Sequence, residues 1–569
     1  MKKYTAGAIS VMYDHGFLRR IAYGETEILR MIYFALRDHN WNTIPHRIEN
    51  EQIVNQNNGF QIQFDCFHSS DGVDVMAWTT NIEGLPDGTL VFEITGKALA
   101  DFNKNRAGFC VLHPLSITDQ LCIITHPNRS TTKQVFPAAV AAENPFKDII
   151  SMAWETAGQT YTLFFEGEVF ETEDQRNWSD ASFKTFCTTL DKPFPVLLKK
   201  GEVVYQRITF RPSSVLATVK AGPAYISLRD TGINSIVPFM GISASTEIDR
   251  LSPQGEILLR GLKLNHYRID LYPGNANWVT LFSRQYENAF ALGLGLEVAL
   301  HLTENFKEET EAFIMLCQQN KVKVKKLLLL SHNGLVTGQK IIDHATVLKQ
   351  TLPKVSLGAG TDYNFNEINK NQFKANGLDF ISFSIDPQEH ATDDLTVLEN
   401  TESMSHLVNS ARLIYGESIR IHISPVTLRR RFNPYATNPA DHFIEETKKA
   451  DPRQKAAFTA VWGFGSLCSL ARGGAESVTF FQTMGNQGII SAEADPYPVY
   501  QMLKNFAVYQ GKKANIMESS DPFRVQGILL DTKVLGLVNL TGDQTEIRIN
   551  NNIHHLGPHE IKFTTLPRP

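Results

Sequence analysis

The strongest constraint on the fold is a regular alternation of apolar strands and amphipathic stretches between about residues 233 and 510. Eight apolar runs of strand length occur there: 235–243, 266–272, 296–302, 326–332, 354–360, 379–385, 419–424 and 477–483. Helix-like stretches such as 278–293, 307–321 and 402–416 follow them. Eight such units in about 280 residues match the size of one (β/α)8 barrel. An open doubly wound sheet fits less well, because the first strand–helix turn, 241–250, lacks a glycine-rich phosphate motif.

Regions whose sequence is typical of β-strands lie on both sides of this alternating segment. Up to about residue 211, short alternating runs are separated by turn residues, which predicts a large antiparallel sandwich, with a jelly roll as the alternative. Strand-like runs return after about residue 511 as a small β module. We therefore expect a supersandwich-like β domain over 1–230, a catalytic (β/α)8 barrel over 231–510 and a small C-terminal β domain over 511–569.

Charge and cysteine usage exclude several classes of protein. The 569-residue chain has 55 basic and 60 acidic residues, so it carries no basic field for nucleic acid. It has no apolar run of the roughly 18–20 residues that span a membrane, and no signal-peptide core at its start. Its six cysteines are scattered without a CxxC pair, which favours a reducing cytoplasm over disulfides or a zinc site. We expect a cytoplasmic protein without metal, cofactor, nucleic-acid or membrane partner; a homo-oligomer stays open.

Polar side chains face the interior on four of the eight predicted barrel strands. Side chains alternate along a strand, and this parity points the following residues inward: Arg268, Asp270, Tyr272, Glu297, His301, Ser382, Ser384, Asp386, Arg420, His422 and Ser424. Branched apolar residues usually fill such an interior. For the deeper members Arg268, Glu297 and Arg420, a buried ion-pair network is the simpler interpretation.

Histidines, carboxylates and amides also gather at the predicted C-terminal ends of the strands, where barrel enzymes have their active sites. They are Tyr272, His301, Glu304, His332, Asn333, Asp362, Asn366, Glu367, Asp386, His390, His422, Ser424, Gln482 and Thr483. Such a set suits general acid–base chemistry. The chain has no GxSxG elbow for a serine nucleophile and no HExxH metal motif. A metal site built across strands from His301, His332, His390 and His422 is the alternative.

The carboxylate pattern of a retaining glycosidase is missing. Such an enzyme on this barrel would place one carboxyl group after strand four and a second after strand seven. Here strand four ends Ser331-His332-Asn333 and strand seven ends Ser424-Pro425-Val426. The asparagine–glutamate dipeptide typical of these enzymes occurs as Asn366-Glu367, after strand five. The barrel therefore has glycosidase architecture without the glycosidase pair.

Several segments together resemble the D-apionate lactonase family. They are AYGETEILRMIYFALRDHNWNTIP (22–45), NRAGFCVLHPL (105–115), FEGEVFETEDQRNWSDASFKTFCT (165–188), GAGTDYNFNEIN (358–369), DPQEHATDD (386–394), SPVTLRRRFNP (424–434) and DPRQKAAFTAVWGFGSL (451–467). The resemblance covers essentially the whole chain, and the stretch DQRNWSDASFKT is its most specific part. It implies a glycosidase-like barrel with β domains that hydrolyses a five-membered aldonolactone, D-apionolactone, to D-apionate in D-apiose catabolism.

One position departs from the family. Its strand eight usually ends in a Glu-Thr-Thr-Gly run, whereas this chain has Gln482-Thr483-Met484-Gly485. If that glutamate is the base of the family, another residue takes its role here.

Lactone hydrolysis needs an activated water, stabilisation of the oxyanion and a proton for the leaving ring oxygen. We expect Glu367 to be the base and His390 or His422 the acid or electrophile. The expected substrate contacts are Asn366, Asp362, Glu304, His332, Arg429, Gln482 and Thr483. Two alternatives stay open: a glycoside hydrolase that uses Glu304 and Glu367, and a non-catalytic carbohydrate-binding protein.

The charged and aromatic segment 171–186 has three interpretations. It is a solvated turn, a polar plug between the β domain and the barrel, or a direct substrate contact through Arg176 and Lys184. Its aromatic residues Trp178, Phe183 and Phe186 favour burial.

Overall fold

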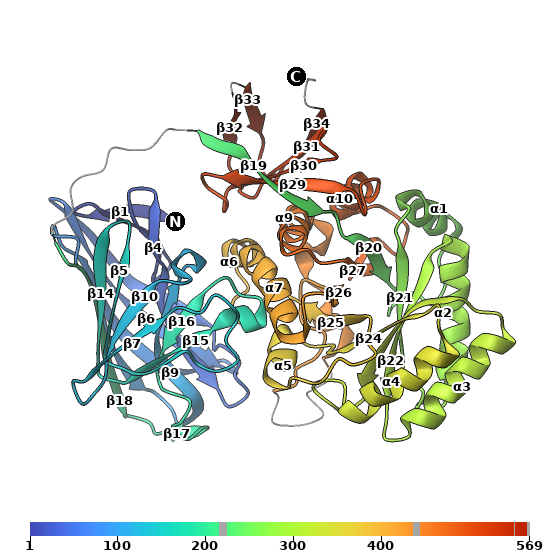
Figure 1. The fold of residues 1–569 in the computed structure, drawn as a ribbon. Helices are drawn as coiled ribbons and strands as arrows, with labels where there is room; N and C mark the ends of the chain where they lie inside the picture. Colours follow the sequence, from blue (N-terminus) through green and yellow to red (C-terminus); the bar gives the residue numbers. More distant parts are fainter. Residues whose placement is uncertain (215–224, 436–443, 551, 566–569) are drawn as a thin grey trace. The chain divides into compact units, whose positions relative to one another are not determined.

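The computed structural model describes residues 1–214, 225–435, 444–550 and 552–565 (Figure 1). The chain folds into two units. Met1–Gln175 and the described residues from Ala181 to Ser214 form most of the first unit. The second unit contains Arg176–Asp180 together with most of the chain from Tyr225 onward. Five residues in the middle of the N-terminal β region thus group with the barrel.

The first unit is an antiparallel β-sandwich, as the sequence predicts. One sheet runs β1 (Lys2–Ala6), β2 (Ile9–Asp14), β3 (Phe17–Tyr23), β4 (Thr26–Asp38), β9 (Phe102–His113), β16 (Phe183–Phe186), β15 (Phe170–Asp174) and β12 (Phe146–Ile149), with β17 (Val196–Leu198) on β9. The other runs β11 (Thr131–Val135), β10 (Leu121–Thr125), β13 (Ser151–Thr156), β14 (Gln159–Glu166), β18 (Val203–Pro212), β8 (Leu90–Ala98), β7 (Val73–Gly84), β6 (Gly59–Ser70) and β5 (His46–Gln56). Alternate residues of these strands, among them Trp78, Trp154 and Phe109, are buried in one shared core.

The second unit contains a closed barrel of parallel strands. In order these are β20 (Phe239–Ser243), β21 (His266–Leu271), β22 (Gly295–Leu302), β23 (Val324–Ser331), β24 (Ser356–Gly360), β25 (Phe380–Ile385), β26 (Arg420–Val426) and β27 (Ser477–Met484). β20 pairs with β27 and closes the ring, and the short β28 (Gly488–Ile490) adds to β27. All eight predicted barrel strands are confirmed.

Helices connect the strands. In the described part of the chain they are α1 (Pro253–Leu262), α2 (Trp278–Leu292), α3 (Phe306–Gln319), α4 (Gln339–Thr351), α5 (Phe365–Lys370), α6 (Asp394–Glu399), α7 (Met404–Tyr415), α8 (Glu446–Lys449), α9 (Ala457–Gly473) and α10 (Pro498–Ala507). Short 3-10 turns lie at Leu115–Ile117, Gln175–Trp178, Asn400–Ser403 and Pro452–Lys455. The local sequence explains the helix ends: Ser252 caps α1 by accepting from the Gly255 backbone N–H, and Gly293 and Gly474 end α2 and α9 in the left-handed conformation.

A third sheet completes the second unit. It runs β33 (Asn552–Leu556), β32 (Thr545–Ile549), β19 (Ile226–Ile236), β29 (Lys513–Ser519), β30 (Val525–Leu530), β31 (Val534–Asn539) and β34 (Ile561–Thr565). β19 precedes the barrel in sequence, yet it pairs with β29 and β32 (Figure 1). The C-terminal β module therefore includes a strand from the start of the barrel region, and the exact domain limits stay a prediction.

Among the described helices, none has both the length and the apolar character needed to cross a membrane.

Candidate active site

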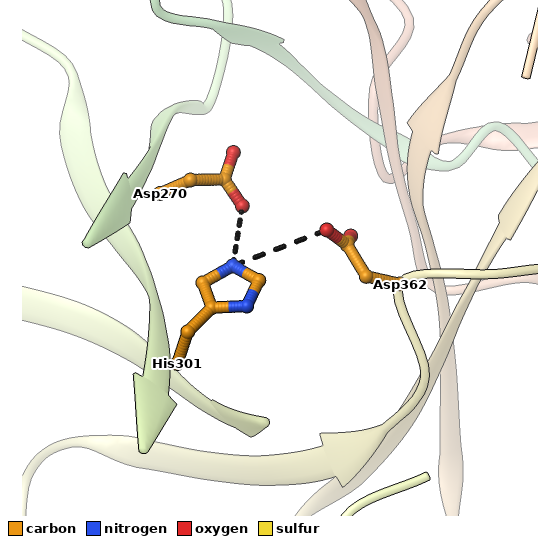
Figure 2. Close-up of side chains that lie close together, drawn as sticks. All are labelled: Asp270, His301 and Asp362. Carbon is orange, nitrogen blue, oxygen red and sulfur yellow. Dashed lines mark hydrogen bonds and ion pairs between the residues drawn. The ribbon is translucent and has the colours of Figure 1, made fainter. Parts of the chain in front are cut away.

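Two carboxylates and a histidine meet at the C-terminal end of the barrel. Asp270 lies near the end of β21, His301 near the end of β22, and Asp362 just after β24. The Nε2 atom of His301 lies 3.1 Å from Asp270 Oδ1 and 3.9 Å from Asp362 Oδ2 (Figure 2). The Asp270 side chain is 21% exposed and that of Asp362 7% exposed. Strand parity predicts Asp270 and His301 inside the barrel and Asp362 at its rim, and the structure brings the three together.

Two arginines bind both carboxylates. Arg268 Nη2 donates to Asp270 Oδ1 and to Asp362 Oδ1, each at 2.7 Å. Arg431, from the loop after β26, donates through Nη1 to Asp362 at 2.8 Å and through Nη2 to Asp270 at 3.2 Å. Burial alone would raise the pKa of Asp270, but the two guanidinium groups and the hydrogen bond from His301 hold it well below its ordinary value. Asp270 is thus an anion that accepts hydrogen bonds, and a weak base.

A buried polar network beneath this cluster holds Arg268 in place. Arg268 Nη1 donates to the backbone oxygen and the hydroxyl of Ser424, at 2.5 and 3.0 Å. The Ser424 hydroxyl donates to Glu297 Oε1 at 2.7 Å, and Lys326 lies 3.1 Å from Glu297 Oε2. The predicted ion-pair network therefore exists for Arg268 and Glu297, with Lys326 as a member that the sequence did not reveal. Arg420 lies elsewhere and donates to the backbone oxygen of Asp379.

Aromatic side chains line the histidine. The Tyr272 ring stacks on His301 with a centroid distance of 4.1 Å and an interplanar angle of 13°. His332, which follows β23, meets the same tyrosine ring edge-on at 5.5 Å. The stacking fixes the plane of the imidazole, so its free nitrogen points in a defined direction.

The Asp270–His301–Asp362 group has the donor atoms of a cation site, and its three ligand atoms lie within 4.8 Å of one another. Both carboxylates are nevertheless already paired with Arg268 and Arg431, so their two negative charges are balanced by two positive ones. A divalent cation would gain little attraction here.

A second aspartate–histidine pair involves His390, in the loop between β25 and α6. His390 Nδ1 lies 2.6 Å from Oδ2 of Asp180, which belongs to the five residues that group with the barrel. Asn400 donates to the other carboxylate oxygen of Asp180 at 3.0 Å. Asp180 is buried and the His390 side chain is 19% exposed. The sequence analysis predicted His390 as a site residue but did not identify Asp180 as its partner.

Side-chain bonds connect the loops that carry the two pairs. Asn364, two residues after Asp362, donates to Glu389 Oε1 at 2.9 Å. Arg430, next to Arg431, lies 3.4 Å from Glu389 Oε2. Because Glu389 directly precedes His390, the loops after β24, β25 and β26 are tied together.

Asp386, directly after β25, is a buried carboxyl group beside this second pair. Burial, with the nearby negative charges of Glu389 and Asp180, raises the pKa of Asp386 well above its ordinary value. Asp386 is therefore the carboxyl group here that tends to carry a proton.

The predicted base, Glu367, lies on α5, and its side chain is buried. Its Oε1 accepts a hydrogen bond from the amide of Asn366 at 2.9 Å. Five of the six residues of this short helix are buried. The contacts described for Glu367 and Asn366 do not join them to the Asp270–His301–Asp362 cluster.

His422 lies toward the opposite end of the barrel. Its Nε2 is 2.7 Å from Glu476, which precedes β27, and its ring stacks on Phe380 at the start of β25. Burial, with the nearby positive charge of Lys326, lowers the pKa of His422 to about 4. β26 continues to Val426, four residues past His422, which explains why parity gave the right face but the wrong height.

The remaining predicted contacts are dispersed. Arg429 is 3.2 Å from Asp451, and Gln482 accepts from the Thr246 backbone N–H at 2.9 Å. The Thr483 hydroxyl is buried without a hydrogen-bond partner among the described residues. Glu304 is exposed in the turn between β22 and α3. Among these contacts, only Asp362 and His332 lie in the described cluster around His301.

Sequence reasoning missed Arg431 and Asp180 as site residues. Three consecutive arginines each bind a different partner, and only Arg431 reaches Asp270 and Asp362. The run Arg429-Arg430-Arg431 was a visible signal, but nothing in it distinguishes one arginine from the next.

A closed (β/α)8 barrel with acid–base side chains at its C-terminal end, accompanied by two β regions, defines a multidomain barrel enzyme. Residues 1–215 match the N-terminal domain of D-apionate lactonase, and residues 240–511 match its TIM barrel domain. The chain belongs to the D-apionate lactonase family. A D-apionate lactonase from Brucella anthropi is 26% identical over 579 aligned positions, which cover 96% of this chain and 93% of that protein.

Solved structures with a related arrangement include a family 51 alpha-L-arabinofuranosidase from Bifidobacterium longum. It has a TM-score of 0.42 and 12% identity, covering 61% of this chain and 95% of that one. A family 44 xyloglucanase from Paenibacillus polymyxa has a TM-score of 0.38 and 9% identity, covering 60% and 97%.

Proposed function

We propose that this protein hydrolyses a sugar aldonolactone, D-apionolactone, to D-apionate at the C-terminal end of its barrel. Family membership supports the reaction class. The observation that carries the site is the Asp270–His301 pair, which is held between two arginines and whose Asp270 side chain is 21% exposed. Lactone hydrolysis adds water across one bond and needs no redox cofactor.

His301 is the general base in this proposal. Its Nε2–H donates to Asp270, which leaves Nδ1 without a hydrogen-bond partner among the described residues. That nitrogen takes a proton from water as the water oxygen attacks the lactone carbonyl carbon. A positioned base of this kind contributes about 10²–10⁴ in rate. Asp270 orients the ring and stabilises the imidazolium that forms.

Arg431 and Asp362 supply the contacts to the substrate. The Arg431 side chain is 18% exposed, so its guanidinium is available to a developing oxyanion. The Asp362 Oδ2 atom is buried without a hydrogen-bond partner among the described residues, which suits an incoming substrate hydroxyl. Tyr272 and His332 offer ring faces to the apolar side of a sugar.

The experiment follows acid release from D-apionolactone with a pH indicator, beside an uncatalysed control. We expect turnover by the wild type and about a 10²-fold lower kcat for His301→Asn. His344→Asn, on α4, is the matched control and should stay within threefold. Failure of the wild type to accelerate hydrolysis would overturn the proposal, and release of a chromophore from aryl glycosides instead would favour a glycoside hydrolase.

The same assay tests Glu367 as the base. If His301 is the base, Glu367→Gln keeps its activity within threefold of the wild type. A large loss in Glu367→Gln together with an active His301→Asn would return the role to Glu367.

A further inference from the structure

We propose that Asp180 is the positioning residue of a second acid–base pair, in which His390 gives the lactone ring oxygen its proton as the ring opens. Asp180 is encoded between two strands of the N-terminal sandwich, far in sequence from the barrel that it serves. The inference rests on the lactonase function proposed above and adds a proton donor to it.

Residues 176–180 are an integral part of the barrel unit, because most of them contact a specific residue of that unit. The Asn177 side chain accepts from Asn369 at 2.8 Å, and the Ser179 backbone oxygen accepts from the Ser403 hydroxyl at 2.8 Å. Lys370 lies 5.6 Å from the Trp178 ring centroid. Anchors on α5 and on the turn before α7 thus fix the backbone that presents Asp180.

The hydrogen bonds of the pair define what each nitrogen of His390 can do. Nδ1 donates to Asp180 Oδ2 at 2.6 Å, and Asn400 holds the second oxygen of Asp180. The Trp178 ring meets His390 edge-on at 5.5 Å and limits its rotation. Nε2 has no hydrogen-bond partner among the described residues, so it is the nitrogen that can exchange a proton with a substrate.

The charges around the pair agree with this role. Glu389 is neutralised by Arg430, and Asp386 tends to carry a proton because its pKa is raised by burial. Asp180 is the carboxyl group that hydrogen-bonds directly to the imidazole, so it is the group that can compensate a positive charge on the ring.

The reaction needs one proton acceptor and one proton donor, and the two histidines supply them. Water gives its proton to His301 as the C–O bond to the carbonyl carbon forms. When the bond between that carbon and the ring oxygen breaks, the ring oxygen takes the proton from His390 Nε2. Afterwards His301 releases a proton to solvent and His390 takes one up.

The test compares Asp180→Asn, His390→Asn and the double variant with the wild type. If Asp180 acts through His390, we expect Asp180→Asn to lower kcat by about 10²-fold with KM within threefold. The double variant should lie within threefold of His390→Asn, because removing the positioning residue costs nothing once the donor is gone. The control His344→Asn, on α4, changes a histidine outside both pairs and should keep kcat within threefold.

Three kinetic results would overturn the inference: Asp180→Asn within threefold of the wild type, losses that multiply in the double variant, or an effect on KM alone. A readout independent of turnover is the downfield proton resonance of the short Asp180–His390 hydrogen bond. We expect it in the wild type and in His344→Asn and not in Asp180→Asn or His390→Asn; its absence from the wild type would overturn the pair. If the wild type does not hydrolyse the lactone, the proposed function fails, and the donor role with it. Hydrolysis that Asp180→Asn leaves unchanged overturns the role of Asp180 alone.

Discussion

At the scale of single residues, neighbours in sequence have very different positions in the site. Arg429, Arg430 and Arg431 bind Asp451, Glu389 and the Asp270–Asp362 pair, respectively. Of the three arginines, only Arg431 contacts residues of the proposed reaction centre. The three arginines therefore form a natural series for substitution.

Arg431→Met should lower kcat/KM about 10²–10³-fold, because it removes a donor for the oxyanion and leaves two carboxylates with less compensating charge. Arg429→Met should stay within tenfold, since its partner Asp451 is also held by Arg453 at 2.9 Å. Steady-state kinetics on D-apionolactone checks both variants. The reverse order of effects would point to Arg429 as the substrate contact.

His422 makes a prediction about stability and pH. The folded state lowers its pKa to about 4 from 6.5, so the neutral ring stabilises the fold fully above about pH 6.5. This contribution is lost as the pH falls toward 4, and amounts to about 3 kcal/mol at most. In His422→Phe, the urea midpoint should fall less steeply between pH 6.5 and 4 than in the wild type. Parallel curves would contradict this, and kcat should stay within threefold, because the ring lies away from the cluster around His301.

At the scale of elements, α9 is buried on all sides, which its mixture of glycine, alanine and large apolar residues allows. Small residues let α7 approach it closely at Gly473, where an added Cβ would lie 2.9 Å from Val408 Cβ and 3.0 Å from backbone atoms of Ser405. The neighbours at Gly473 cannot move without shifting α7. At Gly463 the nearest atom, at 2.6 Å, is instead the flexible end of Met502.

Gly473→Ala should therefore destabilise the protein by about 1–3 kcal/mol through overpacking. Gly463→Ala is the matched control on the same helix. There the gain in helix propensity, up to about 1 kcal/mol, offsets the cost of moving the Met502 side chain. Thermal unfolding of the two variants decides the comparison; equal melting temperatures would contradict the close approach of α7 and α9.

At the scale of the whole molecule, the C-terminal sheet depends on both ends of the barrel region. β19 enters it before the barrel, and β29–β34 enter it after α10. The Phe563 ring, on β34, lies 5.5 Å from Phe506 of α10 and 6.1 Å from Phe464 of α9. The sheet is thus packed on helices of the barrel unit.

A chain that ends at residue 511 should aggregate or melt about 10 °C or more below the full chain. The truncation removes both neighbours of β19 and exposes its apolar residues Ile226 and Leu228 together with unpaired backbone groups. Melting curves and size-exclusion chromatography check this. A truncated chain as stable as the full one would show that the sheet is dispensable.

The sequence by itself determined the fold class, since periods of two and of about 3.6 residues distinguish strands from helices and eight units fill one barrel. It also placed Asp270, His301 and Asp362 on inward or rim positions, because parity along a strand fixes the face of each side chain. Tertiary structure decided which of these side chains meet. His422 lies too far from the C-terminal end of its strand to reach the rim. The conformation of the loop after β26 directs only Arg431, of three consecutive arginines, to Asp270 and Asp362. The path of the chain places Asp180 next to His390. These outcomes depend on contacts between residues that are far apart in sequence; Asp180 and His390, for example, are separated by 210 positions. Packing in three dimensions decides which of these residues meet, and a local sequence pattern contains no information about it.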